Sequence, residues 1–191
     1  MTRFDNRSIL YLHGYDSSSK GLKPQRLREL CTANRLLIPD LSTDPLQCMT
    51  LSEDTLKTAS NDTIIIGASL GGFYAYYLAA KYKKDCLLIN PVAEPAIEAK
   101  KMLALETDLE KKKVILHAAN MYLSYVSNLK SLKKPKNCFV ALGLHDTVID
   151  PQITREYFQD AEIKEYDDDH IMINSFNEVL SDFEDYLQDK A

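Results

Sequence analysis

The sequence of 191 residues has few glycines, no closely spaced cysteines and no long apolar run, and each shortage argues against a class of protein. With six glycines it carries neither a G-x-G-x-x-G pattern nor a phosphate-binding loop, so we predict no cofactor. The four cysteines form no C-x-x-C pair, which suits a reducing compartment better than a disulfide framework. No segment approaches the roughly 20 apolar residues of a membrane span, and the first apolar run is too short for a signal peptide. We therefore expect a cytoplasmic protein without a membrane partner.

Positive charge is also in deficit. The chain has 23 Lys and Arg against 28 Asp and Glu, a formal net charge of -5, whereas general nucleic-acid binding requires a basic surface. Nucleic acid is therefore not an expected partner. The length and the hydrophobic fraction of 45% are typical of one globular domain, so residues 1–191 are interpreted as a single domain. These quantities leave the oligomeric state open.

Short apolar runs alternate with stretches of helical spacing along most of the chain. Six runs predict strands, at residues 9–12, 36–38, 63–67, 85–90, 137–143 and 161–166. The remaining patterns predict helices, at residues 22–34, 47–58, 73–80, 94–105, 109–132, 151–158 and 174–188. This alternation is typical of a mostly parallel sheet with helices on both faces. Residues 92–134 contain only helical patterns, and we interpret them as a small helical cap inserted over the site.

A turn centred on a serine organises the chain. Gly67-Ala68-Ser69-Leu70-Gly71 has the spacing glycine, any residue, serine, any residue, glycine, and it lies between a predicted strand and a predicted helix. This is the nucleophile-elbow pattern, in which a strand turns sharply into a helix and holds the serine at the tip. Small residues are needed two positions before and two after the serine, because side chains there would collide across the turn. We therefore predict that Ser69 is a nucleophile.

A serine hydroxyl needs a base to take its proton, and that base is usually a histidine oriented by a carboxylate. After a nucleophile elbow these groups follow the chain order serine, aspartate or glutamate, histidine. Asp146 and His170 each follow a predicted strand in that order, so we predict Ser69, Asp146 and His170 as the catalytic residues. Asp150 is a rival acid, but it is better explained as the N-cap residue of a helix that begins at Pro151.

The tetrahedral intermediate of acyl transfer also needs backbone N–H donors, which form an oxyanion hole. One is expected to be the N–H of Leu70, directly after the nucleophile. The second is expected from the loop after the first strand, where we choose Tyr15 because Gly14 frees the backbone to turn toward the site. His13 and Gly14 are candidate substrate-binding residues. Two explanations of His13 are equally supported by the sequence. It could line the wall of the substrate pocket, or it could be a structural residue at the end of a strand, bonded to the backbone.

The other histidines are better explained as structural. His145 lies beside Asp146, and His117 lies between apolar neighbours on a predicted helix. A metal site could be imagined from His145, Asp146, Asp168 and His170. The sequence has neither the histidine pairs at helical spacing nor the cysteine clusters of known metal sites, so we predict no metal.

Four stretches of the chain match a known family. They are LYLHGYDSS at residues 10–18, IGASLGGFYA at 66–75, INPV at 89–92 and GLHDTVID at 143–150. In these stretches the sequence resembles the α/β-hydrolases, specifically the small bacterial YqiA/YcfP-type esterases. The likeness runs nearly from end to end and is weak in the cap. The resemblance implies an α/β-hydrolase fold and esterase chemistry, without naming the ester.

The interpretation that combines these patterns is a serine hydrolase. It would cleave a small carboxylic ester or thioester through an acyl-enzyme intermediate. A thioesterase or acyltransferase with the same residues remains an alternative, because the shape of the cap decides which acceptor enters. A non-catalytic binding protein on a hydrolase fold is a second alternative, since a fold does not fix a function. Such proteins often lose a member of the triad, and this chain retains all three.

Overall fold

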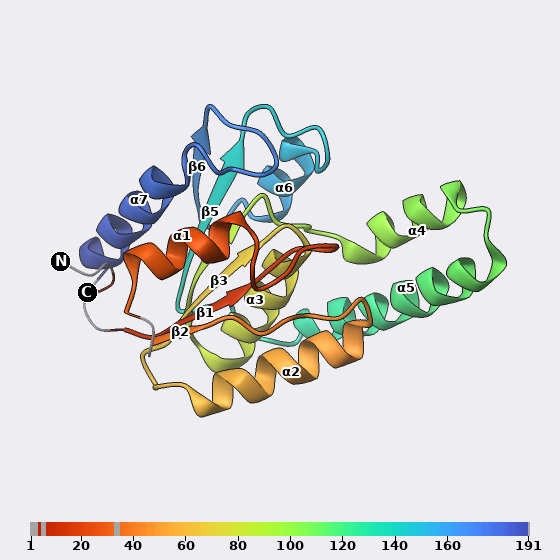
Figure 1. Ribbon diagram of the computed structural model, residues 1–191, viewed down its shortest axis with the longest axis horizontal. Coiled ribbons are helices and arrows are strands. Elements are labelled where there is room, and N and C mark those ends of the chain that lie inside the picture. The colour runs from red at the N-terminus through yellow and green to blue at the C-terminus, as the bar shows by residue number, and fades with distance from the viewer. Residues whose placement is uncertain (1–3, 5–6, 33–34, 191) are drawn as a thin grey trace.

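Six strands form one sheet, and every pair of neighbouring strands runs parallel. The computed structural model describes residue 4, residues 7–32 and residues 35–190. The strand order is β2-β1-β3-β4-β5-β6 (Figure 1). The predicted strands are confirmed as β1 (Ile9–Leu12), β2 (Leu36–Leu37), β3 (Ile64–Ala68), β4 (Asp85–Ile89), β5 (Asn137–Gly143) and β6 (Glu162–Tyr166).

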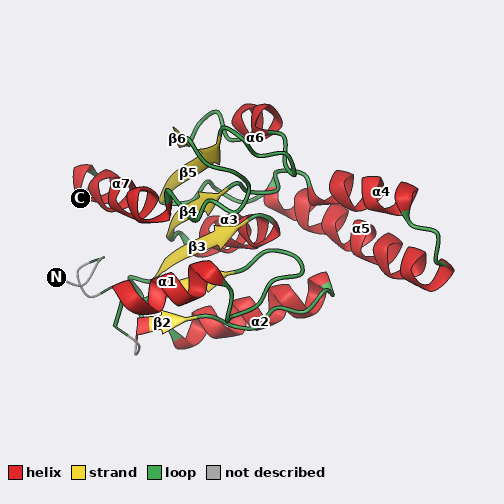
Figure 2. Cartoon of the chain, turned by 45° about the horizontal axis from the view of Figure 1, so that its top comes forward, coloured by secondary structure: helices red, strands yellow, loops and turns green. Residues whose placement is uncertain are grey.

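Helices cover both faces of the sheet, as Figure 2 shows. They are α1 (Leu22–Leu30), α2 (Pro45–Thr58), α3 (Leu70–Tyr82), α4 (Pro95–Leu105), α5 (Leu109–Leu129), α6 (Pro151–Tyr157) and α7 (Phe176–Asp189). Successive side chains of a strand point to opposite faces, so the apolar run of β4 serves two cores. Cys86 and Leu88 pack with residues of α2 and α3, whereas Leu87 and Ile89 pack with residues of α1 and α7.

Aspartate side chains fix where three of these helices begin. Asp44, Asp108 and Asp150 stand just before α2, α5 and α6, and their carboxylates accept backbone N–H groups at 2.8–2.9 Å. These bonds satisfy donors that have no partner inside the helix. Pro151 occupies the first turn of α6, so the explanation of Asp150 as an N-cap residue is confirmed.

α1 is shorter than the sequence predicts. The N–H of Cys31 donates to the carbonyl of Leu27 at 2.9 Å and closes the last turn, but Cys31 itself is extended, with φ -121° and ψ 153°. The predicted continuation of the helix is therefore wrong at Cys31 and Thr32, and residues 33–34 lie outside the described residues. The sequence has neither glycine nor proline at the end of α1, so it gives no local signal that the helix ends there. The other predicted elements agree with the structure to within three residues at each end.

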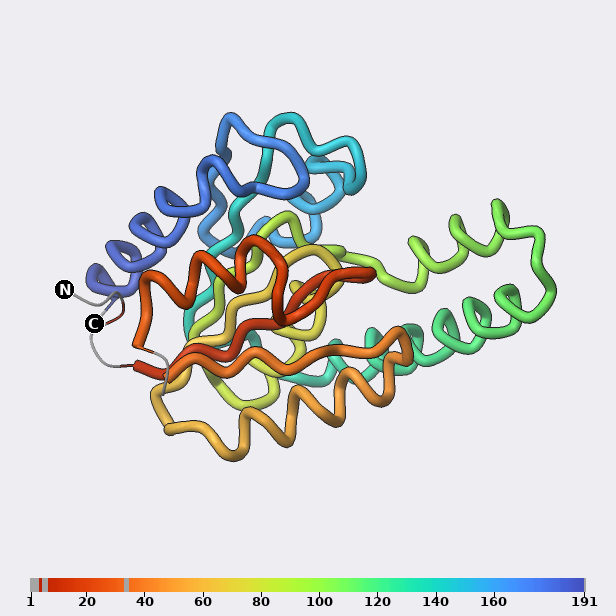
Figure 3. Tube along the Cα trace, in the orientation of Figure 1, coloured from red at the N-terminus to blue at the C-terminus, as the bar shows by residue number. Residues whose placement is uncertain are grey.

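α4 and α5 form a helical hairpin (residues 95–129) that projects from the sheet between β4 and β5, with the two helices side by side (Figure 3). Residues 92–134 contain these helices and no strand, as predicted. At the root of the hairpin, Tyr122 of α5 contacts Phe73 and Tyr74 of α3, with ring centroids 5.9 and 6.4 Å apart. The hairpin is thereby fixed to the helix that follows Ser69. No helix in the described chain is both long and apolar enough to cross a lipid bilayer.

The strand order reverses at β1, which has β2 on one side and β3 on the other. In open parallel sheets, ligands bind at the carboxyl ends of the strands near such a reversal. The register places Leu12, the last residue of β1, beside Gly67 of β3. The loop after β1 and the turn that carries Ser69 therefore start next to each other.

Candidate active site

Ser69 stands at the turn between β3 and α3 in a conformation that residues other than glycine rarely adopt, with φ 53° and ψ -124°. A Cβ atom on Gly67 would collide with the carbonyl oxygen of Gly71 and lie 2.6 Å from the Cβ of Ala75. A Cβ atom on Gly71 would collide with the carbonyl oxygen of Leu12. The requirement for small residues on both sides of the serine is therefore confirmed.

Three backbone hydrogen bonds hold this strained turn in place. The N–H of Ser69 donates to the carbonyl of Ile89 at 2.9 Å, and its carbonyl accepts from Gly72 at 2.9 Å and from Val92 at 3.0 Å. Two of the partners belong to the end of β4 and the segment that leads into the hairpin. The turn is thus supported from the neighbouring strand, and the serine lines a pocket at its tip.

The loop after β1 comes close to Ser69. A Cβ atom on Gly14 would lie 3.1 Å from the Cβ of Ser69, which is tighter than an ordinary contact. Tyr15 and Leu70 line the same pocket as the serine. Across the described hydrogen-bond network, neither the N–H of Tyr15 nor that of Leu70 has an acceptor. Unpartnered N–H donors beside a serine are what an oxyanion hole requires.

His13 is not among the residues that line the pocket at Ser69. Its side chain is buried, Nδ1 and the carbonyl of Gly14 are 2.9 Å apart, and Nε2 lies 2.9 Å from the backbone nitrogen of Leu41. Because the N–H of Leu41 can only donate, Nε2 is the acceptor and Nδ1 carries the proton. Of the two explanations left open by the sequence, these bonds favour the structural one.

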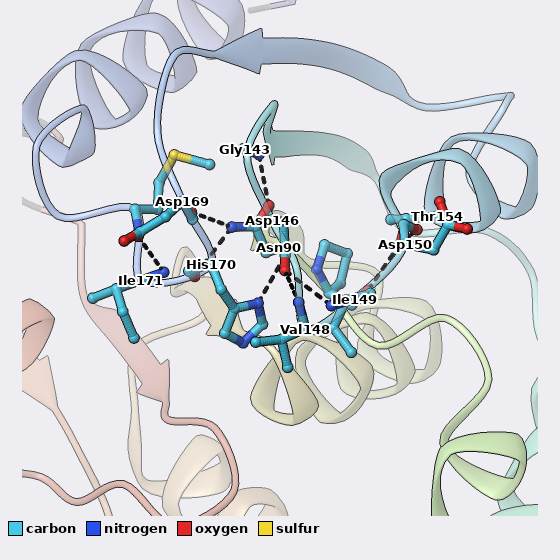
Figure 4. A network of polar contacts seen from close by, with 12 residues as sticks. Asn90, Gly143, Asp146, Val148, Ile149, Asp150, Thr154, Asp169, His170 and Ile171 are labelled. Carbon is cyan, nitrogen blue, oxygen red and sulfur yellow. Dashed lines mark hydrogen bonds and ion pairs between the residues drawn. The ribbon is translucent and has the colours of Figure 1, made fainter. Parts of the chain in front are cut away.

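Asp146 and His170 are joined by a hydrogen bond of 2.7 Å between Oδ2 and Nδ1 (Figure 4). The Asp146 side chain is 1% exposed and that of His170 is 17% exposed. Burial raises the pKa of the Asp146 carboxyl, but hydrogen bonds from His170 and from the N–H groups of Ile149 and Val148 outweigh it and hold that pKa below its usual value. Asp146 is therefore a carboxylate at neutral pH, and Nε2 of His170 can act as an acceptor.

The Ser69 hydroxyl is not hydrogen-bonded to His170 in the part of the chain that the structure describes. Such a bond is often long when no substrate is present and tightens when substrate binds. The structure thus pairs the predicted acid with the predicted base. The predicted nucleophile follows β3, which is two strands from β5 and three strands from β6, at the same carboxyl end of the sheet.

The loop between β6 and α7, which carries His170, is shaped by a second carboxylate. Asp168 is 4% exposed, and it accepts hydrogen bonds from the N–H groups of Asp169 at 2.8 Å and Ser175 at 2.7 Å. Burial raises the pKa of Asp168, and these hydrogen bonds more than reverse that effect. Near this loop, Lys23 of α1 is also buried, and burial lowers its pKa from 10.5 to about 8.

Asn90 ties the loops of the site together, a role that the sequence did not reveal (Figure 4). Its Oδ1 accepts the N–H of Gly143 at 2.7 Å, and its Nδ2 donates to the carbonyls of Asp169 and His170, both at 3.1 Å. The residue is buried, and its φ of 42° lies in the left-handed region that asparagine tolerates. One side-chain amide therefore connects the ends of β4 and β5 to the loop of His170.

None of the four histidines is among the described residues that line the pocket at Ser69, and this includes His170. His145 pairs with Asp167 at 2.7 Å on the surface, and His117 of α5 lies 3.8 Å from Asp44. Among the described residues, no three His, Cys, Asp or Glu side chains are grouped so as to hold a metal ion.

A pocket of about 290 Å³ opens at Ser69. It is bounded by the loops that follow β1, β2, β4 and β5, by the start of α3, and by one side of the helical hairpin. The pocket therefore brings Ser69, Tyr15 and Leu70 together with a segment that the sequence singled out as a cap.

Comparison with known proteins identifies the family. A family model described as "Uncharacterised protein family (UPF0227)" matches residues 8–188. The chain belongs to this family. The match confirms the resemblance to YqiA/YcfP-type proteins that the sequence motifs indicated.

Solved structures of low sequence identity share the fold. An esterase from Pyrococcus furiosus is 19% identical, with a TM-score of 0.65 over 95% of this chain and 81% of the other. Est1E from Butyrivibrio proteoclasticus is 14% identical, with a TM-score of 0.68 over 96% and 87% of the two chains. The mouse alpha/beta hydrolase domain-containing protein 10 is 16% identical, with a TM-score of 0.64 over 100% and 93%. The predicted α/β-hydrolase fold is thereby confirmed.

Proposed function

We propose that this protein is a serine hydrolase that cleaves a small carboxylic ester or thioester through an acyl-enzyme intermediate. The observation that carries the proposal is the 2.7 Å hydrogen bond between Asp146 and His170, at the sheet edge where Ser69 occupies a strained elbow. The structurally similar protein from Pyrococcus furiosus is named as an esterase, which agrees with this chemistry.

In the proposed reaction, His170 Nε2 takes the proton of the Ser69 hydroxyl as its oxygen attacks the carbonyl carbon of the ester. Asp146 stabilises the imidazolium that forms. The negative oxygen of the tetrahedral intermediate accepts hydrogen bonds from the N–H groups of Leu70 and Tyr15, and the N-terminus of α3 adds a favourable dipole. His170 then gives its proton to the leaving alcohol or thiol, and water repeats the sequence on the acyl-enzyme.

The helical hairpin acts in this proposal as the cap that shapes the substrate pocket. Its residues face Ser69 across the pocket, whereas the chemistry is carried by loops of the sheet. Reaction and selection of substrate are therefore assigned to different segments of the chain.

Labelling with a fluorophosphonate probe, read by intact mass, tests the proposal. The wild-type protein is expected to gain one adduct, and Ser69→Ala is expected to gain none. Ser124→Ala is the matched control, because Ser124 is exposed on α5 and does not line the pocket. Hydrolysis of p-nitrophenyl acetate and of an acetyl thioester should follow the labelling.

An unlabelled but folded wild-type protein would contradict the proposal and favour a binding protein on a hydrolase fold. Transfer of the acyl group to an added alcohol in preference to water would instead identify an acyltransferase.

A further inference from the structure

One wall of the pocket at Ser69 is made by the helical hairpin. Eight of the fifteen residues that line the pocket belong to it, among them Pro95, Ala99 and Met102 of α4 and Ile115, Ala118 and Tyr122 of α5. Their spacings of three, four and seven positions put them on one face of each helix. The hairpin therefore turns one continuous side of each helix toward the serine.

This pocket offers a ligand almost no charge. Its one charged residue is Glu98, whose carboxylate pairs with Lys101 at 2.8 Å. The hydroxyl of Tyr122 is engaged with that of Tyr74 at 3.0 Å. Among the described residues that line the pocket, none is Lys or Arg. A carboxylate or phosphate on the acyl group would be left unpaired here, which is costly, whereas an apolar group would be matched.

The volume limits the length of an apolar chain. A methylene group takes up about as much space as a water molecule, whose share of the liquid is roughly 30 Å³. The pocket of about 290 Å³ therefore holds a reacting ester group with a chain of several carbons.

Two alanines face the pocket from opposite helices. Ala99 of α4 is buried and Ala118 of α5 is partly buried. They are the smallest side chains in the wall that the hairpin provides. Since α4 and α5 lie side by side, a larger residue at either position would shorten the space that extends away from Ser69.

We propose that the pocket binds an uncharged, unbranched acyl chain of about six to eight carbons, and that Ala99 and Ala118 set this length. The proposal rests on the proposed function, because the acyl carbonyl must reach Ser69 for its chain to lie along the hairpin. The alcohol or thiol of the substrate leaves on the open side and is not restricted by this wall.

A series of p-nitrophenyl esters from acetate to laurate tests the proposal. For the wild-type protein, kcat/KM is expected to rise by up to about fourfold per added methylene, to peak at hexanoate or octanoate, and to fall at laurate. In Ala118→Phe, the ratio of kcat/KM for octanoate to that for acetate is expected to fall by about 30-fold, since the added phenyl ring takes the place of about two or three methylenes. Ala104→Phe is the matched control, because Ala104 is exposed on α4 outside the pocket, and it should keep the wild-type profile.

Met102→Ala keeps the test decisive if Ala118→Phe fails to fold. Met102 is 43% exposed, so its truncation leaves the core intact, and the enlarged pocket is expected to shift the peak toward decanoate or laurate. Suppose that Ser69 is labelled and p-nitrophenyl acetate is hydrolysed. If kcat/KM then does not depend on chain length, or depends on it in the same way in the wild type and in these variants, the acyl-chain proposal alone is overturned. A protein with neither adduct nor hydrolysis overturns the proposed function as well.

Discussion

The side-chain amide of Asn90 donates a hydrogen bond of 3.1 Å to the main-chain carbonyl of His170, across 80 residues of sequence. The same side chain accepts the N–H of Gly143, three residues before Asp146. The position of the His170 ring relative to Asp146 is therefore set in part from the end of β4. Asn90 is a positioning residue in the proposed reaction, because it acts through the backbone of its neighbours.

Asn90→Gly is expected to lower kcat by about 10- to 100-fold while KM changes by less than about twofold. Glycine accepts the positive φ of this position but supplies none of the hydrogen bonds, and small misplacements of a catalytic group are costly. Asn137→Ala is the control, because Asn137 bonds Asp85 at 2.8 Å at the opposite end of β5. Steady-state kinetics of both variants measure the loss of kcat, and denaturant unfolding measures the loss of stability. Equal loss of stability with unchanged kcat in Asn90→Gly would show a purely structural role.

Asp146→Asn is expected to reduce kcat by about 10³- to 10⁴-fold, because the amide favours the wrong tautomer of His170. Asp150→Asn is the matched control. Asparagine is as good an N-cap residue as aspartate, so α6 should be retained together with the wild-type rate. Hydrolysis of p-nitrophenyl esters measures both variants. A strong loss in Asp150→Asn with little in Asp146→Asn would reverse the assignment of the acid.

Gly67→Ala is expected to lower the free energy of unfolding by about 3 kcal/mol or more, because its Cβ would collide with the backbone of Gly71. Gly21→Ala offers a comparison at the start of α1. There the nearest atom is the hydroxyl oxygen of Ser17, 3.2 Å away, at the end of a mobile side chain. Its cost should stay within about 1 kcal/mol. Urea denaturation monitored by circular dichroism distinguishes the two.

Lys23→Met is expected to stabilise the protein at neutral pH and to lose that advantage in alkali. Burial lowers the pKa of Lys23 to about 8, although the charges of Asp168 and Asp169 oppose the shift. Between pH 8 and 10.5 the unfolded chain binds more protons than the folded one, so the wild-type protein gains stability as pH rises. At pH 7 the gain of the variant is therefore up to about 3 kcal/mol, and it vanishes above pH 10.5.

Urea unfolding at pH 7 and pH 10 measures this difference. Lys20→Met, at an exposed position nearby, is the control and should show no such dependence. An equal gain at both pH values would contradict the assigned cause.

Most of the fold could be predicted because its signals are local. The run Ile64–Ile66 is apolar and β-branched, the turn at Ser69 requires glycines on both sides, and Asp150 stands directly before a proline. Each of these patterns can be recognised within about ten residues. Ser69, Asp146 and His170 lie far apart in the sequence, but each directly follows a predicted strand, so each could be found locally and then combined by the known chain order.

The features that escaped prediction depend on partners far away in the chain. Asn90 acquires its contacts only when β4, β5 and the loop after β6 are assembled. One nitrogen of His13 is engaged by Leu41, 28 residues away, so its role could not be chosen beforehand. The wall of the pocket combines Ala99 of α4 with Ala118 of α5, which are brought together only when the two helices pack. No local pattern encodes such distances.

The helical hairpin leaves the sheet after β4 and returns at β5, and these strands are neighbours. Its two ends are thus anchored one strand apart, whatever its length. Extra turns added in pairs to α4 and α5 would lengthen the arm without moving either strand, and long surface insertions of this kind cost little free energy. Divergence at the far end of the hairpin can therefore proceed without altering the turn at Ser69. The root, where Tyr122 contacts Phe73 and Tyr74, is the part that such changes must retain.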